Sequence, residues 1–256
     1  MQTIFGDPNL DPNLRVRADA ASAVVPVMLA AATRLPQPCE GSMPQLYALG
    51  LYGTILHLFS ACVLLASFGE PTGIPILLRS MYEAMVDLHN LVRDPSYACR
   101  IEHADLKQIL SIMGSGSLRE AFQEKRTGDY EQLSARVAEI EAEGKASLSI
   151  RKRCKAVERL EEYESLYALF CLDTHNNASA LAERHMTESE DGSLQISFFA
   201  EFDPKSVAAR LDFAIQFVFE SARMVHAAFK VPAPEVEALA ARFEDERRHC
   251  TGQFPR

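Results

Sequence analysis

From Met43 to Gly69 the chain reads MPQLYALGLYGTILHLFSACVLLASFG, without a single Asp, Glu, Lys or Arg. At about 1.5 Å per residue, a helix of this length could cross the roughly 30 Å apolar core of a bilayer. Its flanks are Glu40 and Glu70, not the Lys and Arg that anchor membrane spans. His57 falls in the middle, where lipid would penalise an imidazole. We therefore predict that this segment is a buried central helix of a soluble protein and not a membrane span.

This segment also carries a row of small and polar residues at helical spacing. The row consists of Gly50, Gly53, Thr54, His57, Ser60 and Ala61. Small side chains on one side of a helix allow a second helix to approach closely. Pairs of membrane helices use the same device, so the row does not distinguish a soluble bundle from a membrane protein.

Further helices are indicated on both sides of this segment. Apolar residues recur every three or four positions over 74–92 and 203–229, and proline and glycine separate the periodic stretches. Only SLQISFFAEF, residues 193–202, alternates as a strand does. The sequence predicts an all-α fold, a multi-helix bundle with at most one short extended segment or hairpin near 193–202.

The pattern predicts one helical domain over residues 1–256, with a helical core at about 43–230. The stretch 129–155 is dense in charge and has only a narrow apolar seam, which predicts an exposed helical arm. Pro232 and Pro234 precede a charged C-terminal helix at about 234–249.

Composition restricts the classes of function. The formal net charge is −9, which argues against a general nucleic-acid-binding surface. The six cysteines form no C-x-x-C pair, and the N-terminal stretch lacks the apolar core of a secretory signal. These features predict a reducing compartment, a cytoplasm of bacterial type.

Arg79, Glu83 and Asp87 lie four residues apart and therefore on one side of the 74–92 helix. One interpretation is a pocket in which the guanidinium orients Glu83 or Asp87 as a catalytic base. The other is a row of ion pairs at a surface or interface. The residues themselves leave both open.

His175 follows Thr174 and precedes Asn176, within a polar cluster on an otherwise apolar helix. Its imidazole could act as a general base, or it could be a structural histidine bonded to a backbone carbonyl. The chain has no metal-ligand spacing, glycine-rich phosphate loop or G-x-S-x-G elbow. We therefore predict neither a metal nor a cofactor.

Arg242 and His249 have the R-x6-H spacing of ribonucleases of the HEPN superfamily. Phe243 stands where those enzymes often place a polar residue. The helix around them is charged on all sides, which favours a solvated helix face over a nuclease site.

LLRSMYEAMVDLHNLVRDP (77–95) and YESLYALFCLDTHNNASAL (163–181) resemble the paired signatures of a bacterial helical family, domain of unknown function 5677. The likeness covers roughly residues 46–229. It implies that Arg79, Glu83 and His175 belong to one polar cluster between two core helices, as a buried, hydrogen-bonded group. It implies no activity, because the family is uncharacterised.

Three hypotheses follow, in descending order. The first is a binding or regulatory module, within a bacterial defence or toxin system, whose partner is an unknown protein or a second copy. The second is a hydrolase or HEPN-like ribonuclease that uses a buried Arg/Glu/His cluster. The third is a membrane-associated protein that uses residues 43–69.

Overall fold

The computed structural model describes residues 10–114, 130–174, 178–188, 192–196 and 203–251, and it confirms the all-α prediction. The only strands among these residues form a short hairpin. The elements are α1 (Pro12–Ala32), α2 (Met43–Ser67), the 3-10 turn η1 (Pro71–Gly73), α3 (Ile74–Arg93), the 3-10 turn η2 (Pro95–Tyr97), α4 (Ala98–Gly114), a helix over 130–142, α6 (Ile150–Ala156), α7 (Leu160–Glu162), the π-helix η3 (Tyr163–Tyr167), α8 (Ala168–Thr174), α9 (Ala178–His185), β1 (Met186–Glu188), β2 (Leu194–Ile196), α10 (Pro204–Ala228) and α11 (Pro234–Thr251).

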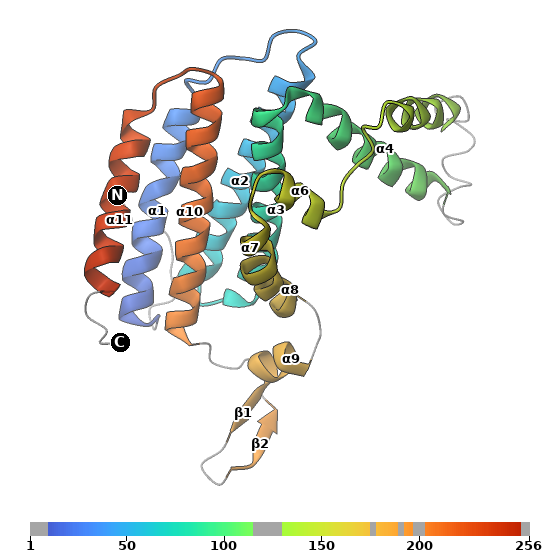
Figure 1. The fold of residues 1–256 in the computed structure, drawn as a ribbon. Helices are drawn as coiled ribbons and strands as arrows, with labels where there is room; N and C mark the ends of the chain where they lie inside the picture. Colours follow the sequence, from blue (N-terminus) through green and yellow to red (C-terminus); the bar gives the residue numbers. More distant parts are fainter. Residues whose placement is uncertain (1–9, 115–129, 175–177, 189–191, 197–202, 252–256) are drawn as a thin grey trace.

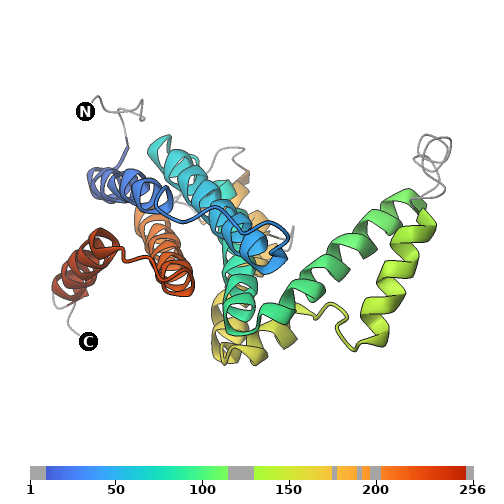
Figure 2. The ribbon, with the colours of Figure 1, turned by 90° about the horizontal axis from the view of Figure 1, so that it is seen from above.

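Helices α1, α2, α3 and α10 form the bundle that contains the main core (Figure 1). Seen from above, α1 and α2 lie side by side, while α11 lies outside α1 and α10 (Figure 2). Asp11 and Asp203 begin α1 and α10, since each carboxylate accepts two backbone N–H groups that have no partner within the helix. The bounds of α10 agree with the predicted periodic stretch 203–229.

The apolar segment forms α2, and among the described residues it is the one helix long and apolar enough to span a membrane. Its most apolar stretch has a mean hydropathy of 1.9, yet only 39% of that stretch is buried within the chain. The prediction of a buried central helix is therefore correct for one side only. Large residues such as Ile55 and Phe59 face the core, whereas Gly50 and His57 are exposed.

Helix α4 and the 130–142 helix run out from the bundle and back, as Figures 1 and 2 show. We call these two helices, with the connecting residues as far as 149, the arm. They share a small core of their own around Leu106, Val137 and Ile140, separate from the main core. Gly144, at a φ of +71°, ends the returning helix in a conformation that favours glycine.

From α6 to α8 the chain returns along α3. Beyond α8, the helix α9 and the hairpin extend from one end of the bundle (Figure 1). Strands β1 and β2 are antiparallel, with Met186 opposite Ile196. The hairpin agrees with the predicted extended segment, although 197–202 lie outside the described residues.

Candidate functional site at the root of the arm

Arg79, Glu83 and Asp87 occupy successive turns of α3, on the side turned away from Leu78 and Met85 in the core. The side chains of Arg79 and Glu83 are 30% and 31% exposed, and that of Asp87 is 18% exposed. The row is thus half-buried. Segments that come from much later in the chain, and from η2, cover it.

Asp87 is bonded from both ends of the arm. The Tyr97 hydroxyl, in η2 where the arm leaves the bundle, donates to Oδ1 at 2.6 Å. Nη1 of Arg153, in α6 where the chain returns, donates to Oδ2 at 2.6 Å. Both are charge-assisted bonds, the stronger class of hydrogen bond. One carboxylate on α3 therefore fixes both roots of the arm.

The surroundings of Asp87 change its acidity in opposing directions. Burial raises the pKa of the Asp87 carboxyl, and this outweighs the lowering by the Arg153 charge and by the Tyr97 hydrogen bond. Burial and the nearby Asp87 charge together raise the pKa of the Tyr97 phenol, which therefore keeps its proton as a donor. These shifts fit a desolvated structural junction whose donors stay protonated at neutral pH.

Glu83 has its own set of donors. Tyr167 donates its hydroxyl proton to Oε1 at 2.7 Å, and Nε of Arg79 lies 3.2 Å from the same oxygen. Arg79 also donates to the Tyr167 hydroxyl at 3.2 Å and lies over its ring. Oε2 of Glu83 lies 3.7 Å from Arg153 Nη2, which links this group to Asp87.

Tyr167 comes from the π-helix η3, where the helix widens by one residue per turn. The widening stacks Tyr167 on Tyr163, with ring centroids 5.2 Å apart, while its hydroxyl reaches Glu83. Burial first, and then the Glu83 bond, raise the pKa of the Tyr167 phenol. It too remains a proton donor.

We call these six residues the root cluster: Arg79, Glu83, Asp87, Tyr97, Arg153 and Tyr167. It contains two cations, two anions and two phenols, and each carboxylate accepts bonds from two of the other members. In this geometry Glu83 and Asp87 act as acceptors that join α3 to η2, α6 and η3.

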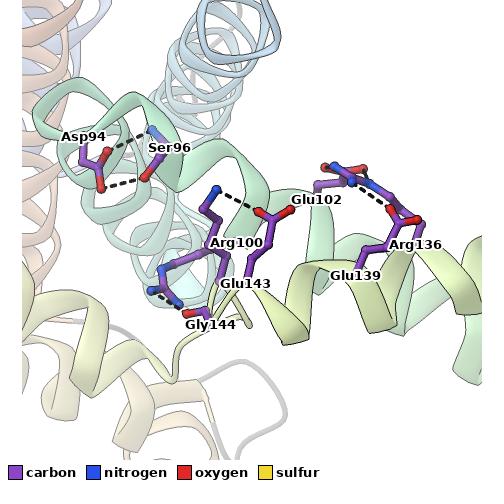
Figure 3. Close-up of polar contacts among 9 residues, drawn as sticks. Asp94, Ser96, Arg100, Glu102, Arg136, Glu139, Glu143 and Gly144 are labelled. Carbon is purple, nitrogen blue, oxygen red and sulfur yellow. Dashed lines mark hydrogen bonds and ion pairs between the residues drawn. The ribbon is translucent and has the colours of Figure 1, made fainter.

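Three further sets of contacts strengthen the root. Asn90 donates to the carbonyl of Arg153 at 3.1 Å, one turn beyond Asp87. Figure 3 shows the other side, where Arg100 at the start of α4 donates to the carbonyl of Gly144 at 3.2 Å. Asp94 caps η2 through the amide and hydroxyl of Ser96, each at 2.9 Å (Figure 3). The roots are thus bonded to the bundle and to one another.

Polar bonds also hold the arm itself. Arg136 on the returning helix forms a two-pronged pair with Glu102 on α4, at 2.8 and 2.9 Å, and a third contact with Glu139 (Figure 3). His103 is buried between the helices, where its Nδ1 accepts the Ser147 amide at 3.0 Å. Its Nε2 therefore carries the proton, which faces Glu141 at 3.1 Å.

The predicted site residues have different positions in the structure. Arg79, Glu83 and Asp87 form one row, as their spacing indicates. Thr174 is the last residue of α8, and its side chain lies outside the described part of the chain, as do His175 and Asn176. Their predicted place beside Arg79 and Glu83 stays a prediction.

The R-x6-H pair lies on α11, far along the chain from the root cluster. Arg242 is exposed and pairs with Glu246 at 2.8 Å, one turn further on. The side chain of His249 is outside the described residues. Within the described residues, no group of three or more His, Cys, Asp or Glu side chains could hold a metal ion.

Sequence reasoning missed half of the root cluster. Arg153 lies in the charge-dense stretch 129–155, which the sequence predicts to be an exposed helical arm, and no pattern links Tyr97 or Tyr167 to the carboxylates. One signal was present: Arg153 precedes Cys154, which is fully buried, so the stretch has an inward side. Nothing in the sequence pairs Tyr97 with Asp87 beyond the tight turn between them.

A comparison with protein families identifies the chain. Residues 45–193 match the model of the Family of unknown function (DUF5677), so the chain belongs to that family. The matched segment contains α3, the arm and all six residues of the root cluster. Searches of curated proteins and of solved structures gave no match.

Proposed function

We propose that this chain is a non-enzymatic binding protein whose helical bundle presents the arm to a protein partner. The observation that carries the proposal is the double attachment of Asp87, which bonds the outgoing and the returning root of the arm at 2.6 Å each. A clamp of this kind gives a projecting element a defined direction, and a preorganised surface binds at a lower entropic cost.

The charges of the arm favour a protein partner. Over 98–114 and 130–145 the chain has four basic side chains and six acidic ones. A surface that binds nucleic acid needs an excess of Lys and Arg. Large apolar side chains are exposed near the outer end of the arm: Ile112 is 43% exposed and Tyr130 is 42% exposed. Apolar and aromatic anchors within a polar rim are typical of protein interfaces.

The cytoplasm is the setting we propose, with a regulatory complex such as those of bacterial defence or toxin systems as the context. The cysteines that the structure describes are all free thiols, which supports a reducing compartment. Free thiols do not indicate which cytoplasmic complex the chain joins. The arm, in contrast, can be tested by mutation.

The test compares two glutamate substitutions on exposed isoleucines. Ile112→Glu alters the arm, and Ile76→Glu, 46% exposed on α3, is its matched control. We expect affinity capture from the native cells to recover one partner with the wild-type and Ile76→Glu chains. With the purified partner, Ile112→Glu should raise the Kd at least about tenfold, because a charge is buried without a counter-charge.

The enzyme hypothesis predicts a different result. Turnover of an ester or RNA substrate by the purified chain, lost in a folded Glu83→Gln variant, would replace the binding proposal. Equal partner affinity of Ile112→Glu and wild type would remove the arm from the interface.

A further inference from the structure

The side of α2 that faces away from the core forms a regular row. Its positions recur at alternating steps of four and three, and we call them the outer stripe: Met43, Tyr47, Gly50, Thr54, His57, Ala61, Leu64 and Phe68. All eight are at least partly exposed. This spacing is that of a helix that packs against another helix along its whole length.

Tyr47 packs partly against the core and lies beside α4, whereas the middle and the far end of the stripe are open within the described residues. A Cβ atom built on Gly50 or Gly53 meets no atom within 4 Å, and the Thr54 hydroxyl bonds only to a carbonyl of its own helix. Leu64 is 50% exposed and Phe68 is 46% exposed. An uncharged exposed face of this length is unusual for a monomer and marks an interaction surface.

The outer stripe is complementary to itself in the antiparallel direction. If a second α2 is placed with its midpoint, between Ile55 and Leu56, over that of the first, Met43 lies opposite Phe68. Gly50 then lies opposite Ala61, and Thr54 opposite His57. Bulky apolar residues meet at the ends, where helices that cross at a small angle diverge, and small residues meet where the axes are closest.

The same arrangement gives His57 a role. It is the most polar residue of the stripe, and it is exposed on the side of α2 that faces away from the core. Across the twofold axis an imidazole nitrogen meets the Thr54 hydroxyl of the second copy, twice by symmetry. Polar pairs of this kind fix the register of helix dimers.

We infer that the outer stripe of α2 is the face by which two copies of this chain associate, as an antiparallel helix pair. A helix of this length is about 39 Å long, so a contact about 10 Å wide buries roughly 800 Å² over both copies. The adjacent α1 has no charged residue from 20 to 32 and exposes Leu29. Stacking α1 on its symmetry mate brings the total to roughly 1,600 Å², the size of a stable interface.

Among the described residues, the stripe touches the arm only at Tyr47, which lies beside Glu102 and Asp105 of α4, so the inference does not depend on the proposed function. Charge favours a second copy over a lipid surface. The stripe is neutral, and the residues that flank it are Glu40 and Glu70, which an anionic membrane repels. A second copy of the chain presents the same neutral face and is always available as a partner.

The test measures the mass of the full-length chain at micromolar concentration by light scattering during gel filtration. We expect twice the chain mass of 28.4 kDa. Leu64→Glu should give a monomer, whereas Leu169→Glu, a control of 49% exposure on α8, should remain a dimer. Leu46→Glu, 51% exposed at the other end of α2, serves as a second disruptive variant.

Disulfide trapping tests the direction. In a Cys39→Ser background, a mixture of Thr54→Cys and His57→Cys chains should cross-link between the two variants more than either variant with itself. A monomeric wild type, a dimer indifferent to both Leu64→Glu and Leu46→Glu, or wild-type binding to phosphatidylcholine vesicles that Leu64→Glu abolishes would overturn the inference.

Discussion

Asp87 is the carboxylate of the root cluster on which most of its connections depend, because it is the least exposed one there and bonds two donors from different elements. Arg79 and Glu83 are nearly twice as exposed and pair with one another on the same helix. Water screens such a pair more strongly. The buried pair implied by the family resemblance is thus half-buried, and the deeper charge pair is Asp87 with Arg153.

Asp87→Ala, which removes the acceptor of both donors, should therefore destabilise the chain more than Arg79→Ala does. We expect a loss of about 2–3 kcal/mol for Asp87→Ala, since the Tyr97 hydroxyl and Arg153 Nη1 both lose their acceptor and Arg153 keeps only a 3.7 Å contact with Glu83. For Arg79→Ala we expect about 1 kcal/mol or less. Urea unfolding followed by circular dichroism measures both, with the exposed Glu161→Gln as the control. Equal losses for the two variants would contradict this order.

At this scale the sequence predicted which residues share a helix face, and little else. The step of four residues places Arg79, Glu83 and Asp87 in one row whatever the rest of the fold does. Tyr167 and Arg153 reach that row from 84 and 66 residues away. Contacts over such separations depend on tertiary packing, which periodicity does not encode.

The arm is the element whose stability is most separate from the bundle. Its core consists of Leu106, Val137 and Ile140 with three partly buried neighbours, and it does not merge with the main core. Small clusters under projecting elements open with less free energy than a central core does. The arm should therefore behave as its own unfolding unit.

Ile140→Ala tests this independence. Ile140 is 1% exposed, so the truncation should cost about 2–4 kcal/mol of the arm's local stability. Hydrogen exchange should accelerate in α4 and the 130–142 helix and stay unchanged in α3 and α10. Uniform acceleration throughout the chain would show that the arm and the bundle unfold together.

Acid should loosen the arm before the bundle. Hydrogen bonds from Arg136 lower the pKa of the Glu102 carboxyl, and those from His103 and Lys107 lower the pKa of Glu141. A carboxyl whose pKa is lower in the folded chain adds stability above its unfolded pKa and loses it as pH falls through the folded pKa. Asp87 has the opposite sign, because its pKa is raised and its contribution grows as pH falls.

Amide-resolved NMR during acidification measures this order. Below the ordinary glutamate pKa of 4.5, signals of α4 and 130–142 should lose dispersion before those of α10. Glu102→Gln should flatten the pH dependence of the arm, since a neutral amide has no proton to take up. Simultaneous loss of arm and bundle signals would argue against the assignment to these carboxyls.

The sequence was most informative about the positions of individual helices. An Asp-Pro pair stands at the start of both α1 and α10, and such signals can be found in a sequence because they act within one turn. The sequence did not predict which side of α2 faces the core and which side faces solvent. A helix that is uncharged on every side has no polar face to indicate which side meets water, so the open stripe of Gly50 and His57 appeared only in the structure.

For the whole molecule, the account reduces to a bundle that holds a projecting arm in a fixed direction. Three parts of the chain are held together by different contacts. Apolar packing stabilises the main core, paired charges and phenols form the root cluster, and a small apolar cluster with ion pairs stabilises the arm. The root cluster is the junction that connects the other two, together with Ala98 and Ile101 of α4, which pack against the main core. If the binding proposal is correct, loss of the junction should affect partner binding without unfolding the bundle.

The most direct test is the distance between the arm and the bundle. Nitroxide labels on non-cysteine amino acids at the exposed positions Ala138 and Ala209 report this distance by double electron–electron resonance. We predict one narrow distribution for the wild type, and a broad one for Asp87→Asn and for Tyr97→Phe, with the bundle still folded. A distribution equally narrow in all three chains would contradict the claim that the root cluster sets the direction of the arm.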